Sequence, residues 1–301
     1  MKNLPVFLMG CGGVGRQLLQ HIVSCRSLHA KQGLHLRVVG VCDSKSLVVV
    51  ADVLTSEFDD SFLLEVCRVK SNGSSLQTLA NSGVCQVFSG PEVIRKVIDI
   101  GLLGKSTGLA FVDCSASAET IGVLNQVVDF GCCVVLANKK PLTVPMEDYD
   151  KLVSQPRRLR HESTALILAR LLGRRLNLDN MKIESLYPEE MGPDVMPLED
   201  FLVNGLPLLD QKIEDRIKQA SANGNVLRYV CLIDDARCEV GIQQVPNDSA
   251  LGRLRGSDNV VEIYSRCYEK QPLVIQGAGA GNDTTAAGVL ADILDIQDLF
   301  P

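Results

Sequence analysis

The chain has 301 residues, of which 46% are hydrophobic and 22% are charged, and its net charge is −6. These values predict a globular protein of one large or two smaller domains. The acidic balance argues against a nucleic-acid partner, and no apolar run reaches the roughly 20 residues that cross a membrane. The 11 cysteines include no C-x-x-C pair, so we expect reduced thiols. The first apolar run begins within a few residues of Met1, which leaves no room for a signal or transit peptide and predicts a cytoplasmic protein.

The first motif is a glycine-rich turn after a short apolar run. Val6–Met9 predicts a buried parallel strand, and Gly10, Gly12 and Gly15 follow at G-x-G-x-x-G spacing before a helix at 16–29. We expect the first glycine to allow the turn, the second to let a pyrophosphate approach the backbone, and the third to let the helix pack on the strand. The phosphates would lie at the helix N-terminus. A glycine turn that serves packing alone is the alternative.

A second apolar run, Leu36–Cys42, predicts the next strand and ends at Asp43. An acid at this place can accept a hydrogen bond from the adenosine ribose, although Asp43 lies farther from Gly15 than is usual. Lys45 could bind a 2′-phosphate or could be an exposed turn lysine. The choice between NAD and NADP therefore stays open.

Helix-like and strand-like segments continue to alternate up to about residue 145. The helical segments are 56–69, 91–101 and 119–130, and the strands are 109–112 and 133–137. This alternation predicts an α/β fold with a Rossmann-type, doubly wound parallel sheet. Ser115 follows one strand, where it could meet a coenzyme or cap the next helix. Lys139 and Lys140 follow another strand and could face a cleft or solvent.

The rest of the chain predicts a second domain of the α+β class. Its expected helices are 198–204 and 210–220, with Asp210 as an N-cap, and its expected strands are 181–186, 227–233, 238–245, 260–268 and 273–276. A final helix, capped by Asp283, would return to the first domain. We therefore expect a nucleotide-binding domain at 1–145, completed by 282–301, and a second domain at 146–281.

Four motifs, in this order along nearly the whole chain, resemble the homoserine dehydrogenase family. They are Asn138–Pro141, Arg160–Thr164, Leu251–Leu254 and Gly277–Gly281. The likeness is strongest to short, plant-type monofunctional members, which lack an aspartate kinase domain. It implies an oxidoreductase that interconverts L-homoserine and L-aspartate 4-semialdehyde with NAD or NADP, in threonine and methionine biosynthesis. It also implies a dimer.

The resemblance further implies which residues form the site. Those that would bind the coenzyme are Gly10, Cys11, Gly12, Gly13, Val14, Gly15, Asp43, Ser115, Lys139 and Gly281. Lys139 would also lie near the substrate, as a cation suited to an aldehyde oxygen that gains negative charge. Glu162 matches a position that helps to hold a monovalent cation, such as sodium.

The chain departs from the family directly after Thr164. Family members continue there with a long segment whose Asp and Lys bind homoserine and move its hydroxyl proton, whereas here a helix beginning at Ala165 follows at once. We expect an internal segment to be missing, no catalytic acid–base residue in the chain, an incomplete cation site and impaired turnover. The alternative is a catalytically silent NAD(P)-binding homologue, or a splice or gene-prediction variant, that pairs with a full-length relative.

Overall fold

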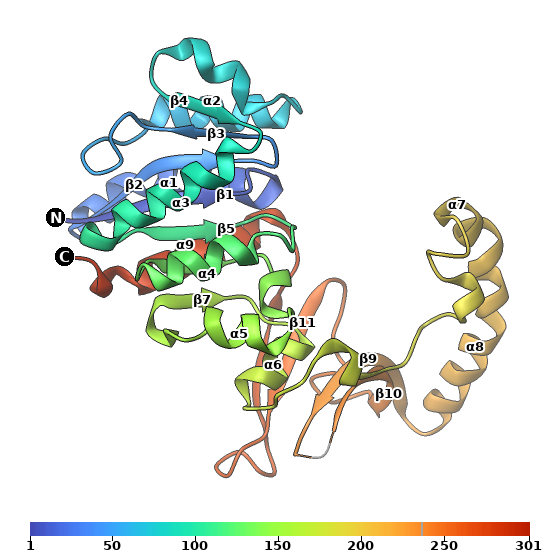
Figure 1. The fold of residues 1–301 in the computed structure, drawn as a ribbon. Helices are drawn as coiled ribbons and strands as arrows, with labels where there is room; N and C mark the ends of the chain where they lie inside the picture. Colours follow the sequence, from blue (N-terminus) through green and yellow to red (C-terminus); the bar gives the residue numbers. More distant parts are fainter. Residues whose placement is uncertain (236) are drawn as a thin grey trace. The chain divides into compact units, whose positions relative to one another are not determined.

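A computed structural model describes residues 1–235 and 237–301, and its contacts divide the chain into two compact units (Figure 1). Unit 1 contains Met1–Thr164 and Ala280–Pro301, and unit 2 contains Ala165–Gly279. Unit 1 extends past the predicted boundary near residue 145 because the segment after it adds one more strand to the same sheet. The end of the chain returns to unit 1.

Unit 1 is built on a seven-stranded sheet with the strand order β4-β3-β2-β1-β5-β6-β7. The strands are β1 (Lys2–Met9), β2 (Leu34–Cys42), β3 (Ser46–Val49), β4 (Gln86–Ser89), β5 (Ala110–Asp113), β6 (Cys133–Leu136) and β7 (Leu159–His161). From β2 to β7 the neighbouring strands are parallel, which confirms the doubly wound prediction. The edge differs, since β3 and β4 are antiparallel strands that the sequence did not reveal.

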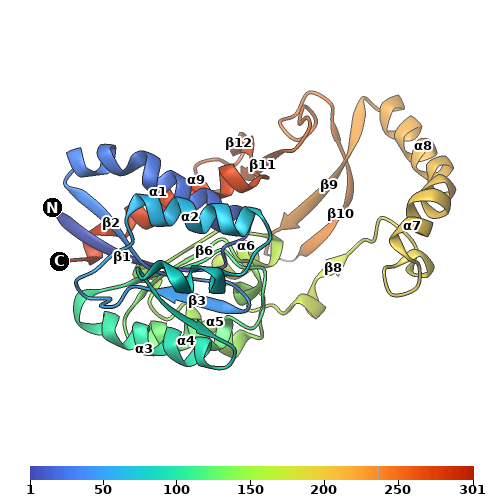
Figure 2. The same ribbon diagram turned by 90° about the horizontal axis from the view of Figure 1, so that it is seen from above.

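Helices cover both faces of this sheet (Figure 2). One face carries α1 (Gly13–Lys31), α2 (Asp60–Ser71) and α9 (Asn282–Asp295), and the other carries α3 (Glu92–Thr107) and α4 (Ile121–Asp129), with α5 (Met146–Leu152) against α4. This double cover explains why β1 and β2 are almost continuously buried and why both read as apolar runs. In the core, the rings of Phe7 and Phe111 lie 5.1 Å apart.

Unit 2 contains helices and two small sheets. Its main elements are α6 (Ala165–Leu171), β8 (Lys182–Ile183), α7 (Leu198–Asp200), α8 (Leu206–Ala222), β9 (Asn225–Ile233), β10 (Cys238–Pro246), β11 (Asp258–Ile263) and β12 (Leu273–Ala278). One sheet has the order β8-β10-β9, and the other pairs β11 with β12. The α+β prediction for this part is confirmed.

Two predicted helix starts are wrong. The helix α8 begins at Leu206, with Pro207 in its first turn, so Asp210 lies inside the helix. The helix α9 has Gly281 as its N-cap, and Asp283 lies in its first turn without capping it. Acids in a first turn still interact favourably with the helix dipole, which is why Asp283 resembles a cap in the sequence.

Candidate functional site

The glycine loop, Gly10–Gly15, joins β1 to α1 and depends on the absence of side chains. Gly10 has a φ of +88°, and a Cβ built on it would lie 2.5 Å from the backbone nitrogen of Ser115. A Cβ on Gly15 would overlap the carbonyl oxygen of Gly10. The start of the loop therefore packs against the backbone that follows β5, and its end packs against its own start.

Gly12 differs from its neighbours because open space surrounds the place where its Cβ would be. It is the N-cap of α1, and no side chain within the described residues caps that helix. The N–H groups of the first turn are thus left without a side-chain acceptor and can bind an anion. Of the other loop residues, Cys11 is buried, and burial above all raises the pKa of its thiol to about 12, whereas Val14 is half-buried.

The C-terminal helix reaches the same loop. The side chain of Asn282, the first residue of α9, lies where a Cβ on Gly13 would be. Gly281 precedes it with a φ of +123°, which favours glycine. The structure thereby brings Gly281 to the glycine loop from the far end of the sequence. No sequence pattern indicated Asn282.

Asp43 lies at the end of β2, as predicted, but both of its carboxylate oxygens already have hydrogen-bond donors. Oδ1 accepts bonds from the backbone N–H of Lys45 and of Ser46, each at 2.9 Å, and from the Ser46 hydroxyl. Oδ2 accepts a bond of 2.7 Å from Nζ of Lys70, on α2. Burial by itself would raise the pKa of Asp43, but the bonds from Lys70 and the two backbone groups lower it on balance.

A buried polar network joins the ends of β5 and β6, where Ser115 and Lys139 begin the following loops. The Asp113 side chain is fully buried, and its carboxylate accepts bonds from the Ser115 N–H at 2.9 Å and from Nδ2 of Asn138 at 3.0 Å. The sequence had given neither Asp113 nor Asn138 a role. Their position directly at the strand ends was the available signal.

Lys139 follows Asn138, and its ammonium nitrogen lies 3.2 Å from Oε2 of Glu162, which follows β7. The resemblance implied a monovalent cation at Glu162. An ammonium group at this carboxylate would repel such an ion, and the part of the chain that the structure describes contains no group of three or more His, Cys, Asp or Glu able to hold a metal. The structure thus gives the Glu162 carboxylate an ammonium partner, and a monovalent cation at this position stays a prediction.

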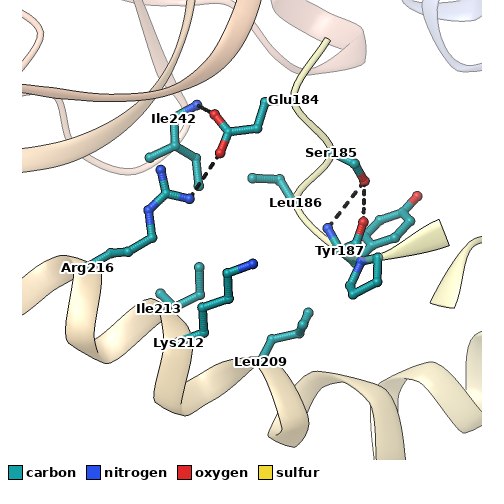
Figure 3. Close-up of a pocket in the computed structure, with 10 residues that line it drawn as sticks. Glu184, Ser185, Leu186, Tyr187, Leu209, Lys212, Ile213, Arg216 and Ile242 are labelled. Atoms are coloured by element: carbon teal, nitrogen blue, oxygen red, sulfur yellow. Dashed lines mark hydrogen bonds and ion pairs between the residues drawn. The ribbon is translucent and has the colours of Figure 1, made fainter. Parts of the chain in front are cut away.

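A cavity of unit 2 contains none of these residues (Figure 3). It has a volume of about 270 Å³ and lies between α8 and the segment 184–188. There Glu184 accepts bonds of 3.0 Å from Arg216 and from the backbone N–H of Ile242, and the bond from Arg216 lowers the pKa of Glu184. Both oxygens of Glu184, the one acid among the described residues that line this cavity, thus accept bonds from donors within the protein.

All the residues predicted from the sequence to bind the coenzyme lie in unit 1. All except Gly281, the N-cap of α9, follow the carboxyl ends of its parallel strands. This edge is where doubly wound sheets bind nucleotides, next to the point where the strand order reverses between β1 and β5. Lys70 and Asn282 are additions that only the structure supplies. No helix among residues 1–235 and 237–301 is long and apolar enough to cross a membrane.

Comparison with known proteins shows similarity to homoserine dehydrogenases. Residues 161–294 match the family model for homoserine dehydrogenase. A bifunctional aspartokinase/homoserine dehydrogenase of Haemophilus influenzae is 24% identical over 371 positions, covering 97% of this chain and 43% of that protein. A homoserine dehydrogenase of Emericella nidulans is 41% identical over 136 residues, covering 43% of this chain and 37% of that protein. The chain thus spans less than half the length of these curated relatives.

Solved structures share the fold. A Candida auris protein described as being of unknown function has a TM-score of 0.80 at 19% identity. The match covers 100% of this chain and 99% of the Candida auris chain. A hyperthermophilic archaeal homoserine dehydrogenase, described in complex with NADPH, has a TM-score of 0.63 at 20% identity and covers 99% of both chains. Fold and glycine loop together define a Rossmann-type α/β protein. Over residues 161–294 the chain is similar to the homoserine dehydrogenase family.

Proposed function

We propose that unit 1 binds NADP(H) and that the chain is a homoserine dehydrogenase-type oxidoreductase with impaired turnover. The observation that carries the proposal is the uncapped glycine loop, flanked by Asp43, Ser115 and Lys139 at the ends of β2, β5 and β6. The archaeal relative described in complex with NADPH supports the choice of coenzyme class. The proposed substrates are L-homoserine and L-aspartate 4-semialdehyde.

The preference for NADP over NAD rests on the ion pair at the end of β2. An acid there usually accepts a bond from the ribose 2′-hydroxyl, and a cation accommodates a 2′-phosphate. Here Lys70 covers Oδ2 of Asp43, so the carboxylate is neutralised and a lysine lies beside it. Lys45, which is exposed, adds a second positive charge nearby. The pair therefore favours the phosphorylated ribose.

On the substrate side, the coenzyme would supply the hydride, and the protein would have to stabilise charge on the substrate oxygen and provide a proton. The Lys139 ammonium is suited to the first task, and the Glu162 carboxylate, 3.2 Å away, would hold it in place. The proton is the difficulty, because the acid–base lysine and aspartate implied by the family resemblance belong to the segment that we propose to be missing after Thr164.

Two observations support a missing segment. The alignment with the Haemophilus influenzae relative runs over 371 positions, more than this chain has residues, so that relative contains residues with no counterpart here. The boundary between the two units also falls between Thr164 and Ala165, and α6 begins there directly after the loop that follows β7. A positioned acid–base group contributes roughly 10²–10⁴-fold to a rate, so we expect turnover reduced by at least that factor.

One experiment tests both halves of the proposal. NADPH is titrated into the purified chain while nicotinamide fluorescence is followed, and aspartate 4-semialdehyde is then added to the same cuvette. We expect saturable binding followed by oxidation far slower than that of an intact homoserine dehydrogenase used as a control. Absence of binding would overturn the proposed function, and oxidation at the control rate would overturn the impairment. Binding with no turnover at all would favour the alternative, a silent homologue that pairs with a full-length relative.

A further inference from the structure

The buried network at the ends of β5 and β6 extends beyond the contact between Asp113 and Asn138. The Asn138 side chain is 4% exposed, and its Nδ2 also lies 2.7 Å from the carbonyl oxygen of Ser117, 3.2 Å from the Ser115 hydroxyl and 3.4 Å from the Thr120 hydroxyl. One amide group thus contacts three residues of the loop that follows β5. The backbone carbonyl of Asp113 accepts the N–H of Asn138 in return, at 3.1 Å.

The amide of Asn138 can have one orientation only. Its Oδ1 accepts the backbone N–H of Lys140 at 3.2 Å, whereas its Nδ2 faces the Asp113 carboxylate and the Ser117 carbonyl. In a flipped amide, Nδ2 would face the N–H of Lys140, and Oδ1 would face the oxygens of Asp113 and Ser117. Neither arrangement pairs a donor with an acceptor. The network is therefore directional and fixes the backbone on both sides of Lys139.

The Ser115 hydroxyl receives a defined role from this arrangement. Its oxygen accepts from the Ser117 N–H at 3.3 Å and lies 3.2 Å from Nδ2 of Asn138, whose two hydrogens are shared with the closer Ser117 carbonyl and Asp113 carboxylate. A hydroxyl has two acceptor positions and one proton. Because both of these neighbours are N–H donors, neither can accept the proton of the Ser115 hydroxyl, which can therefore be donated to a ligand.

Resting on the proposed function, we infer that Asn138 is a positioning residue for the nicotinamide half of the coenzyme. It acts through Ser115, whose oxygen it faces with an N–H donor so that the hydroxyl proton can be donated to a ligand, and through Lys139, whose flanking backbone it fixes. Asp113 anchors Asn138 from the interior of the sheet. The adenosine half would lie over β1 and β2 instead, where the glycine loop and Lys70 supply the contacts.

This division predicts a selective loss of affinity, which calorimetric titration of two ligands can measure. The variant Asn138→Ala should bind NADPH about tenfold more weakly, the effect of roughly one or two lost hydrogen bonds. Adenosine 2′,5′-bisphosphate lacks the nicotinamide half. The variant should bind it within about twofold of the parent chain, because the substitution lies away from the residues proposed to bind the adenosine half. Asn125→Ala is the matched control, since Asn125 is also a buried asparagine of unit 1 but lies on α4.

Ser115→Ala supplies the second arm. It should reproduce the selective loss, and the double variant Ser115→Ala/Asn138→Ala should be weaker than Asn138→Ala by less than about twofold, because residues that act through one another are not additive. Where Asn138→Ala fails to fold, Asn138→Ser, which keeps one donor, takes its place in the same comparison.

Three results would overturn the inference while leaving the proposed function intact. They are unchanged NADPH affinity in Asn138→Ala, equal weakening of both ligands, and fully additive losses in the double variant. Failure of the parent chain to bind NADPH is a different result, which removes the proposed function itself.

Discussion

At the scale of single residues, Asp43 and Lys70 form an ion pair of 2.7 Å in which both side chains are mostly covered. Lys70 also donates a bond of 3.2 Å to the carbonyl oxygen of Ser74, so its position is fixed from two sides. A lysine that is already ordered loses little conformational entropy when it binds a phosphate. The pair is thus a preorganised element of the proposed coenzyme site.

The variant Lys70→Met should therefore reverse the coenzyme preference. We expect NADPH affinity to fall about tenfold or more, the effect of one charge-assisted hydrogen bond, and NADH affinity to stay level or rise because Asp43 can then accept the ribose hydroxyl. Titrations of both coenzymes give the ratio. Lys151→Met, which removes a lysine paired with Asp129 elsewhere in unit 1, is the control. An unchanged NADPH/NADH ratio would contradict the assignment of Lys70.

The stability of Lys70→Met at acidic pH provides a second test. The pKa of Asp43 is lowered in the folded chain, so its contribution to stability is present above the ordinary aspartate value of 3.8 and is lost as the pH falls through the lowered value. Without Lys70 the pKa rises towards its ordinary value. Denaturant unfolding at acidic pH should then show a smaller loss of stability for Lys70→Met than for the parent chain.

At the scale of elements, the joint between β1 and α1 is set by the close approach of the helix start to the strand end. The absence of a side chain at Gly15 lets the first turn of α1 lie on the carbonyl of Gly10, with the Leu8 side chain 3.5 Å from where a Cβ would be. The direction of α1, and hence of its N–H groups, follows from this contact.

Gly15→Ala should accordingly destabilise unit 1 by about 1–3 kcal/mol, because the added methyl group overpacks against backbone that cannot move aside. It should also weaken NADPH binding, since the first turn of α1 must shift. Gly122→Ala is the matched control: open space surrounds this helical glycine, so the change should be neutral or stabilise by up to about 1 kcal/mol. Equal denaturant midpoints for the two variants would contradict the close contact between Gly15 and the Gly10 carbonyl.

At the scale of the whole molecule, the two units differ in how much apolar surface they bury. Unit 1 contains nearly all of the buried large side chains, whereas unit 2 contributes chiefly Leu166, Ile167 and Met181 among its described residues. At the start of unit 2, Leu166 on α6 is buried, whereas Leu171 at the end of the helix is 55% exposed and Leu172, just after it, is 67% exposed.

We therefore expect two unfolding transitions, with unit 2 melting first. Four of the five tyrosines lie in unit 2 and the chain has no tryptophan, so tyrosine fluorescence reports mainly on that unit. Saturating NADPH should raise the later transition, as mass action requires, and leave the tyrosine transition in place. Calorimetry and tyrosine fluorescence recorded together provide the measurement. A single transition that NADPH shifts as a whole would contradict the independence of the units.

The predicted dimer, or heterodimer with a full-length relative, stays a prediction. The strand β12 gives it a candidate surface, since all of its side chains are exposed, including Leu273, Val274 and Ile275. Exposed apolar side chains on both sides of a strand favour association.

The sequence by itself determined the glycine loop, the parallel core of unit 1 and the helix start at Ala165. These features depend on neighbours along the chain, because apolar runs, glycine spacing and a strand followed by a helix are all local patterns. The antiparallel edge formed by β3 and β4 escaped prediction because four-residue strands carry little periodicity.

Only the tertiary structure decided how the polar residues at the strand ends are used. It paired Asp43 with Lys70, tied Asn138 to Asp113, placed the Lys139 ammonium at Glu162 and laid Asn282 over Gly13. Each of these contacts joins residues that are far apart in the chain. Asn138 meets Asp113, and Lys139 meets Glu162, because parallel strands end at one edge of the sheet, whereas Lys70 and Asn282 are brought in by the helices α2 and α9. A charged side chain reveals its chemistry in the sequence, but its partner is set by the fold.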